Sequence, residues 1–237
     1  MWDNHHALDL LANSLFVLVA LAAIYTASQW AAHLPVFPLK EVRVSGINGI
    51  GGIGGELKHV TREQINDAVR SEFMGNFFAV DLDAVCNAFR KLPWVRGATA
   101  RRQWPPRLEV KLEEHVALAR WGSTALVNTH GEIFNAASGE KLPVFQGPEE
   151  SARDMVRQYA VFSKLLRPLR QNIQRINLSP RRAWQVQLDN GTMLELGREQ
   201  MKARLERYVL AHDRGIAPLN QQLSYVDLRY PSGFAVR

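Results

Sequence analysis

Residues Val95–Glu114, with the sequence VRGATARRQWPPRLEVKLEE, decide the fold of the surrounding part of the chain. Val95–Arg102 and Leu108–Glu114 have the composition of strands, and Trp104-Pro105-Pro106 lies between them. Proline fixes φ and has no backbone N–H, so it belongs in a connection rather than in the centre of a sheet. The stretch therefore predicts a hairpin with a rigid turn.

The residues before this hairpin predict one more strand and two helices. Leu39–Ile47 alternates apolar and polar side chains, as a half-buried strand does. Thr61 followed by Gln64 has the pattern of a helix N-cap, and Asp81 caps a second helix with apolar residues at helical spacing. Cys86 falls on that apolar face and is expected to be buried and inert. The order of elements is β-α-α-β-β.

A glycine-rich stretch, Gly49–Gly55, follows the first strand and matches G-x-G-x-x-G at positions 49, 51 and 54. A dinucleotide site needs the last glycine in the first turn of a helix, whose N-terminus faces the pyrophosphate. Here the helix is predicted to start later, at Thr61. We therefore interpret the glycines as a loop and predict no dinucleotide cofactor.

The residues from His115 to Arg237 predict a mixed, mostly antiparallel sheet with two helices, Ser151–Leu166 and Arg198–His212. Asn190-Gly191 joins two alternating stretches and favours a hairpin, because both residues tolerate positive φ. Strands are expected at Val116–Arg120, Ala125–Asn128, Glu132–Asn135, Ile173–Leu178, Trp184–Leu188, Met193–Leu196 and Ser224–Arg229. The fold class of the whole chain is therefore α+β.

The N-terminal stretch Leu10–Ala32 contains 23 residues without a charged side chain. At ~1.5 Å per residue such a helix reaches ~35 Å, enough to cross a bilayer core of ~30 Å. We predict a transmembrane helix at residues 10–34 after a short tail at residues 1–9, and Pro35 prevents its continuation. A cleaved signal peptide is the alternative, which the absence of Lys and Arg before the apolar run disfavours.

The charge distribution predicts an anionic partner without identifying it. From Lys40 onward the chain has 29 Lys and Arg against 21 Asp and Glu, a net charge of +8. The tail has no basic residue while Lys40 and Arg43 follow the helix, so the positive-inside rule does not support a cytoplasmic N-terminus. Basic residues also gather with tryptophans around the hairpin, as in nucleic-acid binders: Arg96, Arg101, Arg102 and Arg107. We favour a solvated basic face there, because alternating strands expose such residues in any case.

No pattern in the sequence predicts catalysis or a metal centre. The chain is 46% apolar and 22% charged, which is typical of a globular protein. Its seven His and single Cys show no metal-ligand spacing, and one Cys excludes an intrachain disulfide. A nucleophile elbow and a Walker A motif are absent. We predict a non-enzymatic protein without cofactor, metal or small-molecule substrate.

Several motifs spread over residues 42–237 resemble the FtsQ/DivIB family of bacterial cell-division proteins. The motifs are Asn76-Phe77-Phe78-Ala79-Val80-Asp81, Lys91-Leu92-Pro93-Trp94-Val95, Arg101–Val110 and Tyr225–Tyr230. The resemblance implies a cytoplasmic tail, one pass through the inner membrane, and two periplasmic domains, a POTRA domain at residues 36–114 and a β domain at residues 115–237. The unbasic nine-residue tail departs from the family's pattern, and so does the long loop Gly49–Gly55.

The resemblance also implies a function. Proteins of this family are non-catalytic, single-pass type II scaffolds of the divisome at the septum, and they bind FtsB, FtsL and other divisome membrane proteins. The alternative is a POTRA-containing factor for outer-membrane protein assembly or secretion; a membrane-tethered nucleic-acid binder is a third class that rests on charge alone. For the POTRA domain we predict recruitment to the division site through a sheet edge, with Val42–Ile47 and the glycine loop as candidates.

The C-terminal strand is the predicted partner-binding site. Ser224–Arg229 is expected to be the last strand, with Val226 and Leu228 inward and an uncovered edge, because the chain ends eight residues after Arg229. An uncovered edge is a template for strand addition. By resemblance the partner-binding residues are Arg182, on a neighbouring hairpin arm and facing an acidic partner residue, with Tyr225, Arg229, Tyr230, Ser232, Gly233 and Phe234.

Overall fold

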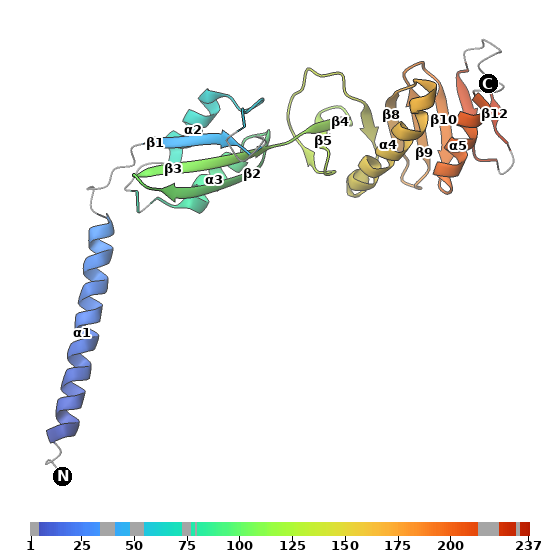
Figure 1. Cartoon of the computed structure of the whole chain (residues 1–237). Helices are drawn as coiled ribbons and strands as arrows, with labels where there is room; N and C mark the ends of the chain where they lie inside the picture. Colours follow the sequence, from blue (N-terminus) through green and yellow to red (C-terminus); the bar gives the residue numbers. More distant parts are fainter. Residues whose placement is uncertain are drawn as a thin grey trace. The chain divides into compact units, whose positions relative to one another are not determined.

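The structure is a computed structural model of the chain and describes residues 5–33, 41–47, 55–72, 77–78, 80–212, 223–230 and 233–237 (Figure 1). The chain divides into two compact units, Met1–Glu114 and His115–Arg237. Several residues used in the sequence predictions lie outside the described residues: Met1–Asn4, Pro35, Leu39, Lys40, Gly49–Gly54, Asn76, Ala79 and Ser232.

The N-terminal helix α1 runs from His5 to His33. It begins inside the segment predicted as a tail, because neither Gly nor Pro interrupts the chain there. Within it, Asp9–Ala27 is long and apolar enough to cross a membrane, by length and composition. The hydroxyls of Ser14 and Thr26 donate to backbone carbonyls of the preceding turn, which satisfies them inside an apolar segment.

The remainder of the first unit has the predicted β-α-α-β-β order. Its elements are β1 (Glu41–Gly46), α2 (Arg62–Glu72), α3 (Leu82–Arg90), β2 (Val95–Gln103) and β3 (Arg107–Glu114). The sheet order is β1-β3-β2, with β1 parallel and β2 antiparallel to β3. The predicted hairpin is therefore confirmed, and its second strand forms the centre of the sheet.

Both predicted helix caps are present. The backbone N–H of Gln64 donates to Thr61 Oγ1 at 3.3 Å, and the N–H of Thr61 donates to Gln64 Oε1 at 3.1 Å. Asp81 Oδ1 accepts from the N–H groups of Asp83 and Ala84. Cys86 is buried and free, as predicted. The core below the helices includes Val85, Phe89, Leu108, Val110 and Leu112.

A buried carboxylate at the end of β3 holds the segment that precedes α2. Glu114 is 8% exposed and accepts from three backbone N–H groups, those of Lys58, His59 and Val60, at 2.8 to 2.9 Å. These N–H groups belong to irregular chain and would otherwise lack partners once buried. The Glu114 carboxylate therefore provides the hydrogen-bond acceptors that a neighbouring strand would otherwise provide for this segment.

The second unit is one nine-stranded sheet with two longer helices packed on it. Its strands are β4 (Ala117–Trp121), β5 (Ala125–Asn128), β6 (Ile133–Phe134), β7 (Val144–Gln146), β8 (Ile173–Leu178), β9 (Trp184–Leu188), β10 (Met193–Gly197), β11 (Tyr225–Asp227) and β12 (Ala235–Val236). The helical elements are η2 (Glu149–Ser151), α4 (Ala152–Leu166), η3 (Arg167–Leu169) and α5 (Met201–Ala211). The sheet order is β12-β11-β10-β9-β8-β7-β4-β5-β6, and antiparallel pairs predominate, as predicted.

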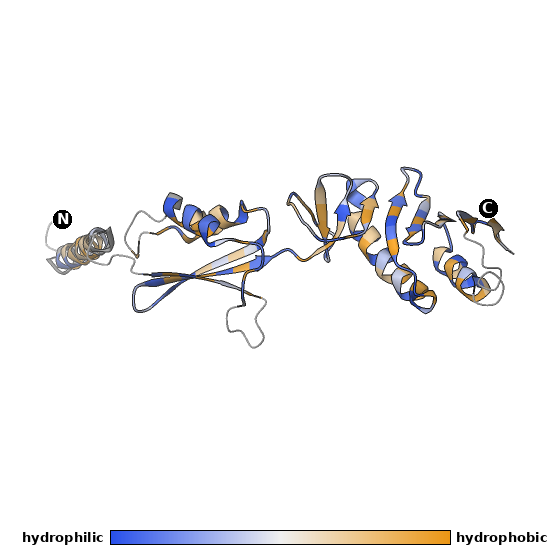
Figure 2. Cartoon of the chain, turned by 90° about the horizontal axis from the view of Figure 1, so that it is seen from above, coloured by the Kyte–Doolittle hydropathy of each residue, from blue (hydrophilic) through white to orange (hydrophobic). Residues whose placement is uncertain are grey.

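One face of this sheet carries the core. Phe162 of α4 and Tyr208 of α5 pack in the same cluster as Ile176, Val186 and Val226 from the sheet. The strands alternate between apolar and polar residues, which Figure 2 shows as alternating orange and blue. The helices therefore cover the apolar face, and the opposite face carries the polar residues of the same strands.

The Asn190-Gly191 hairpin forms between β9 and β10, but its turn differs from the prediction. Only Gly191 has a positive φ, 90°, whereas Asn190 does not. The N–H groups of Gly191 and Leu188 bond the carbonyls of Leu188 and Thr192 respectively. Glycine is thus required at one position of this turn, and Asn190 instead accepts from the N–H of Thr192 through its side chain.

Candidate functional site

The C-terminal edge of the nine-stranded sheet brings most of the predicted partner-binding residues together. β11 pairs in parallel with β10, and β12 pairs antiparallel with β11. The prediction that Ser224–Arg229 has an uncovered edge is wrong, because the chain folds back after Tyr230 and β12 covers that edge. The outer edge of the sheet is β12 itself.

The hydrogen-bond pattern shows which backbone groups of β12 point outward. Arg237 and Tyr225 form a hydrogen-bonded pair, with N···O distances of 2.9 and 3.1 Å. In an antiparallel ladder such pairs alternate with pairs that exchange no bond. Val236, opposite Val226, is therefore in a pair without hydrogen bonds, and its N–H and C=O point away from β11. These two groups form the hydrogen-bonding surface of the edge.

A charged clamp lies at the end of β11. The carboxylate of Asp227 accepts from three groups of Arg229: the backbone N–H at 3.0 Å, Nε at 2.9 Å and Nη2 at 2.6 Å. Asp227 alternates with the inward Val226 and Leu228, but it is only 7% exposed because Arg229 lies over it. Hydrogen bonding to Arg229 holds the pKa of Asp227 below its ordinary value, against the opposing effect of burial. The Arg229 side chain itself remains 57% exposed.

Asp227 continues a row of polar side chains across the sheet face opposite the helices. Asn177 of β8 donates to Gln185 of β9 at 3.0 Å, and Gln185 donates to the buried Glu195 of β10 at 2.7 Å. Glu195 lies opposite Asp227 in the β10–β11 register. Sequence reasoning missed this row, because strand alternation indicates a face but does not show which polar residues on it are buried.

The side chain of Arg229 needs a glycine beside it. Gly197, at the end of β10, has a φ of 73°, and a Cβ there would lie 2.7 Å from Arg204 Nη1 and 3.2 Å from Arg229 Cγ. Arg204 Nη1 also donates to the carbonyl of Leu196 at 2.6 Å. The absent side chain at position 197 thus leaves room for two guanidinium-bearing residues at this corner of the sheet.

Arg182 lies at the same end of the sheet but on a different element from the prediction. It is in the turn between β8 and β9, with a φ of 60°, and β10 separates β9 from β11. Its ion-pair partner is Asp154 on α4, which also pairs with Arg157. The Arg182 side chain is 67% exposed. Arg182 is therefore a surface cation that lies beside α4 and is separated from β11 by other strands of the sheet.

The other predicted partner-binding residues, on β11 and between β11 and β12, differ in their surroundings. Tyr230 is 54% exposed, whereas Phe234 packs partly against the core, with its ring centroid 6.4 Å from that of Tyr208. Gly233 has no atoms near the position of a Cβ. Tyr225 is half-buried on β11, and burial raises the pKa of its phenol, with smaller contributions from Glu195 and Asp227. Ser232 lies outside the described residues.

This edge offers the chemistry of strand recognition. The outward backbone groups of Val236 can pair with an added strand, Tyr230 and Val236 offer exposed apolar surface, and Arg229 offers positive charge. Among the residues that the structure describes, no group of His, Cys, Asp and Glu is arranged to hold a metal ion.

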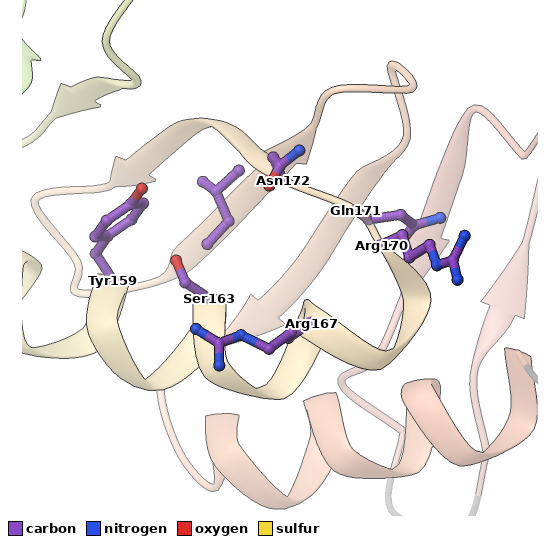
Figure 3. A pocket seen from close by; sticks show the side chains of 7 residues that line it. Tyr159, Ser163, Arg167, Arg170, Gln171 and Asn172 are labelled. Atoms are coloured by element: carbon purple, nitrogen blue, oxygen red, sulfur yellow. The ribbon is translucent and has the colours of Figure 1, made fainter.

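A polar cavity of about 440 Å³ lies beside the C-terminal half of α4 (Figure 3). Its lining residues are Tyr159, Ser163, Arg167, Arg170, Gln171, Asn172 and Ile173. Ser163 Oγ and Gln171 Oε1 are buried without a hydrogen-bond partner in the structure. A nucleophilic serine needs an adjacent base, and the lining contains neither His nor a carboxylate. The cavity therefore provides polar space but no catalytic pair.

The arginines expected to form a basic face on the first unit are mostly engaged. Arg96 pairs with Glu113 at 2.7 Å and Arg101 with Glu109 at 2.5 Å. Arg102 donates to the carbonyls of three residues: Phe77, Phe78 and Val80. Three of the four arginines therefore have partners within the domain, and Arg101 among them remains largely exposed.

Comparison with known proteins agrees with both units. Residues 52–115 match the FtsQ-type POTRA domain, and residues 119–229 match the C-terminal domain of the cell division protein FtsQ/DivIB. A cell division protein FtsQ of Nitrosospira multiformis is 58% identical over all of this chain and 99% of its own length. Those of Burkholderia pseudomallei and Neisseria gonorrhoeae are 39% and 32% identical over all of this chain, covering 94% and 95% of their own lengths.

These matches cover both folded units with the architecture described above, and the relatives match along the full chain, including the N-terminal apolar helix. They agree with the predicted resemblance. The chain belongs to the FtsQ/DivIB family of cell division proteins.

Proposed function

We propose that this protein is a non-catalytic, bitopic scaffold of the divisome in the inner membrane, and that its β domain binds FtsB- and FtsL-type partners at β12. The observation that carries the proposal is the free outer edge of β12, where the N–H and C=O of Val236 point away from the sheet. An extended partner segment would pair there as an additional strand.

The charge at this edge favours an acidic partner segment. Arg229 is held by Asp227 yet remains largely exposed, and Arg182 is exposed at the same end of the sheet. Desolvated, hydrogen-bonded charges contribute most to specificity, whereas rim charges mainly affect the rate of association. We therefore expect the bound segment to carry Asp or Glu opposite these arginines.

Partner capture tests the proposal directly. The full chain in nanodiscs is titrated with a soluble complex of FtsB- and FtsL-type partners, and binding is followed by calorimetry. We expect saturable binding that weakens when the acidic residues of the partner segment are replaced by amides. Absence of binding with a folded chain would remove the proposed partner class.

The expected topology places both folded units in the periplasm and the N-terminus in the cytoplasm. Family membership favours this orientation, while the charge around α1 does not, since Lys40 and Arg43 follow the helix. A reporter that is active only outside the cytoplasm, fused after Arg237, decides the question. An inactive reporter on an intact fusion protein would reverse the orientation.

For the POTRA domain we propose recruitment to the division site. β1 is an outer strand of the sheet, and one side of it pairs with β3. The bridge between Gly46 and Gly55 closes only the end of the strand, so Glu41–Ser45 offers an edge for a partner strand. Septal localisation of a fluorescent fusion that lacks residues 36–114 tests this role, and undiminished localisation would assign recruitment to another part of the chain.

Depletion in cells tests the function as a whole. A divisome scaffold that is required for septum formation leaves cells growing as filaments without septa when it is removed. Normal division with an intact envelope after depletion would contradict the proposed role.

A further inference from the structure

The turn of the β2–β3 hairpin lies at the end of the POTRA sheet where the chain enters from the membrane helix. Arg107, the first residue of β3, pairs with Gln103 of β2 and with Glu41, the first residue of β1. Trp104, Pro105 and Pro106 form the turn beyond this row. Figure 1 shows the start of β1 and the β2–β3 turn at the same end of the sheet.

Two exposed aromatic side chains occupy this end. Trp104 is 68% exposed at the tip of the hairpin. Phe78 is 47% exposed, and its carbonyl accepts from Arg102 Nη2 at 3.2 Å, which places it beside the last residues of β2. Phe78 therefore lies near Trp104, because Arg102, which binds the Phe78 carbonyl, is only two residues before Trp104 at the end of β2.

Trp104 differs from the other tryptophans of the folded units. Trp94 stacks on His59 with ring centroids 3.7 Å apart, and Trp121 and Trp184 are 8% and 6% exposed. The other exposed tryptophan that the structure describes is Trp30, near the end of α1. An amphipathic indole is favourable at the boundary between a bilayer and water. Trp30 lies where that boundary is expected. An exposed indole such as that of Trp104 would be favoured in the same environment.

The covalent connection limits how far this end can lie from the bilayer. The helix α1 ends at His33 and β1 begins at Glu41, so seven residues separate them. A fully extended chain spans at most ~3.3–3.6 Å per residue, so Glu41 lies within ~30 Å of the end of α1. The opposite end of the sheet is farther along the strands by the length of β3, eight residues or ~26 Å. The linker therefore sets a shorter maximum distance from α1 for the hairpin end of the sheet than for its far end.

The basic residues at this end complement phosphate headgroups. Arg43 and Arg101 each pair with one carboxylate, Glu41 and Glu109, and their side chains remain 60% and 64% exposed. Arg107 is a third cation, in the row two residues nearer the hairpin turn and directly opposite Glu41. A guanidinium in an exposed ion pair exchanges its carboxylate for a phosphate at little cost, because exposed pairs contribute little free energy.

We propose that this end of the POTRA domain rests on the lipid headgroups of the membrane that α1 crosses. Trp104 and Phe78 enter the interfacial layer, and Arg101 and Arg107 contact lipid phosphates. The proposal rests on the membrane-spanning role of α1 and is independent of the partners of the β domain. Docking in this way orients the POTRA sheet with its far end, near Val95 and Glu114, directed away from the bilayer.

Depth-dependent fluorescence quenching tests the proposal on the full chain in nanodiscs. A fluorophore is attached to Gln103→Cys, beside Trp104, and in a matched control to Lys91→Cys, an exposed residue at the opposite end of the sheet. The native Cys86 is buried and stays unlabelled under native conditions, which the unsubstituted chain verifies. Lipids with a nitroxide in the headgroup region serve as quencher. We expect quenching at position 103 to exceed that at position 91 several-fold, and equal quenching at both positions would overturn the proposal.

A second measurement separates docking from simple proximity. Trp104→Ser removes the indole, and its effect is compared with Leu210→Ser, which removes an exposed apolar side chain from α5 of the β domain. We expect Trp104→Ser to lower quenching at position 103 and Leu210→Ser to leave it unchanged. Hydrogen exchange of residues 101–107 in label-free protein should be slower in nanodiscs for the unsubstituted chain than for Trp104→Ser. Identical quenching and exchange in both would show that the hairpin does not contact lipid.

Discussion

Asp227 and Arg229 illustrate how single residues determine the shape of the candidate binding edge. Asp227 is nearly inaccessible, and its carboxylate binds both the backbone and the guanidinium of Arg229. These contacts fix the chain direction where it leaves β11, before it turns back into β12. At the residue scale, the edge therefore depends on a carboxylate that no partner is expected to touch.

Replacing Asp227 with Asn should lower the free energy of unfolding by about 1–2 kcal/mol at neutral pH, because hydrogen bonds to a charged acceptor are lost or weakened. The folded-state pKa of Asp227 lies below its ordinary value of 3.8, so this stabilisation is fully present above that pH. It is lost as the pH falls through the lowered pKa. Urea unfolding of the full chain in detergent at several pH values measures the difference.

The matched control for this prediction is Asp154→Asn. The carboxylate of Asp154 is more exposed than that of Asp227 and pairs with Arg157 and Arg182 at the surface. We expect a loss below about 1 kcal/mol there. The difference in the free energy of unfolding between Asp227→Asn and the unsubstituted chain should vanish below the pKa of the carboxylate. A difference that stays the same at that pH would contradict the assigned role.

Arg182 allows a test of partner binding that leaves its turn intact. Its φ of 60° is tolerated by Asn, so Arg182→Asn removes the charge without backbone strain. We expect partner binding to weaken by roughly 2–4 kcal/mol if Arg182 is a hot spot, as we also expect for Tyr230→Ala. Arg181→Asn, at the exposed neighbouring position, serves as the control, and calorimetric titration with the partner complex gives the affinities.

At the scale of elements, β12 is short but decides where the sheet ends. Its two residues convert β11 from an edge strand into an internal one. Because Arg237 hydrogen-bonds to β11 while the N–H and C=O of Val236 point outward, the two sides of β12 can be changed separately. This separation permits a substitution that affects an added strand and not the sheet.

Val236→Pro removes the outward N–H and retains the bonds between Arg237 and Tyr225. Proline is tolerated at an edge position whose N–H faces solvent, so folding should be unaffected. We expect partner affinity to fall by about 1–1.5 kcal/mol, the contribution of one hydrogen bond. Val236→Thr retains the N–H and should bind as the unsubstituted chain does. Equal affinities of the Pro and Thr variants would mean that the partner does not pair with β12.

In the POTRA domain, the element that depends on a single side chain is the segment before α2. Glu114→Gln replaces one carboxylate oxygen by an NH2 group that faces backbone donors of Lys58–Val60. We expect a loss of about 2–3 kcal/mol in the free energy of unfolding. Glu113→Gln, which removes only the ion pair with Arg96, should lose less than about 1 kcal/mol. Similar losses from both substitutions, measured by urea unfolding, would contradict the structural role of Glu114.

At the scale of the whole molecule, recruitment and partner binding belong to different units of the proposed scaffold. A chain with Val236→Pro should still localise to the septum and divide poorly, whereas a chain without residues 36–114 should fail to localise. Fluorescence microscopy of depleted cells that express each variant distinguishes the two defects. If both variants localised and failed alike, the two roles would not be separable by domain.

The sequence by itself determined the elements that local chemistry controls. The apolar run Leu10–Ala32, the caps at Thr61 and Asp81, and the hairpin around Trp104 each follow from side chains within a few residues of one another. The motifs that resemble the FtsQ/DivIB family are likewise contiguous, so both the fold class and the family follow from the order of the residues alone. Periodicity reports such short-range features well, because one face of each element must be buried.

Only the tertiary structure decided the composition of the binding edge. The pairing of β12 with β11 depends on a return of the chain that no local pattern in two residues indicates. The row from Asn177 to Asp227 and the position of Gly197 beneath Arg229 join residues that are far apart in the sequence. Their burial arises from neighbouring strands and from the guanidinium above them, and these contacts exist only after the sheet has assembled.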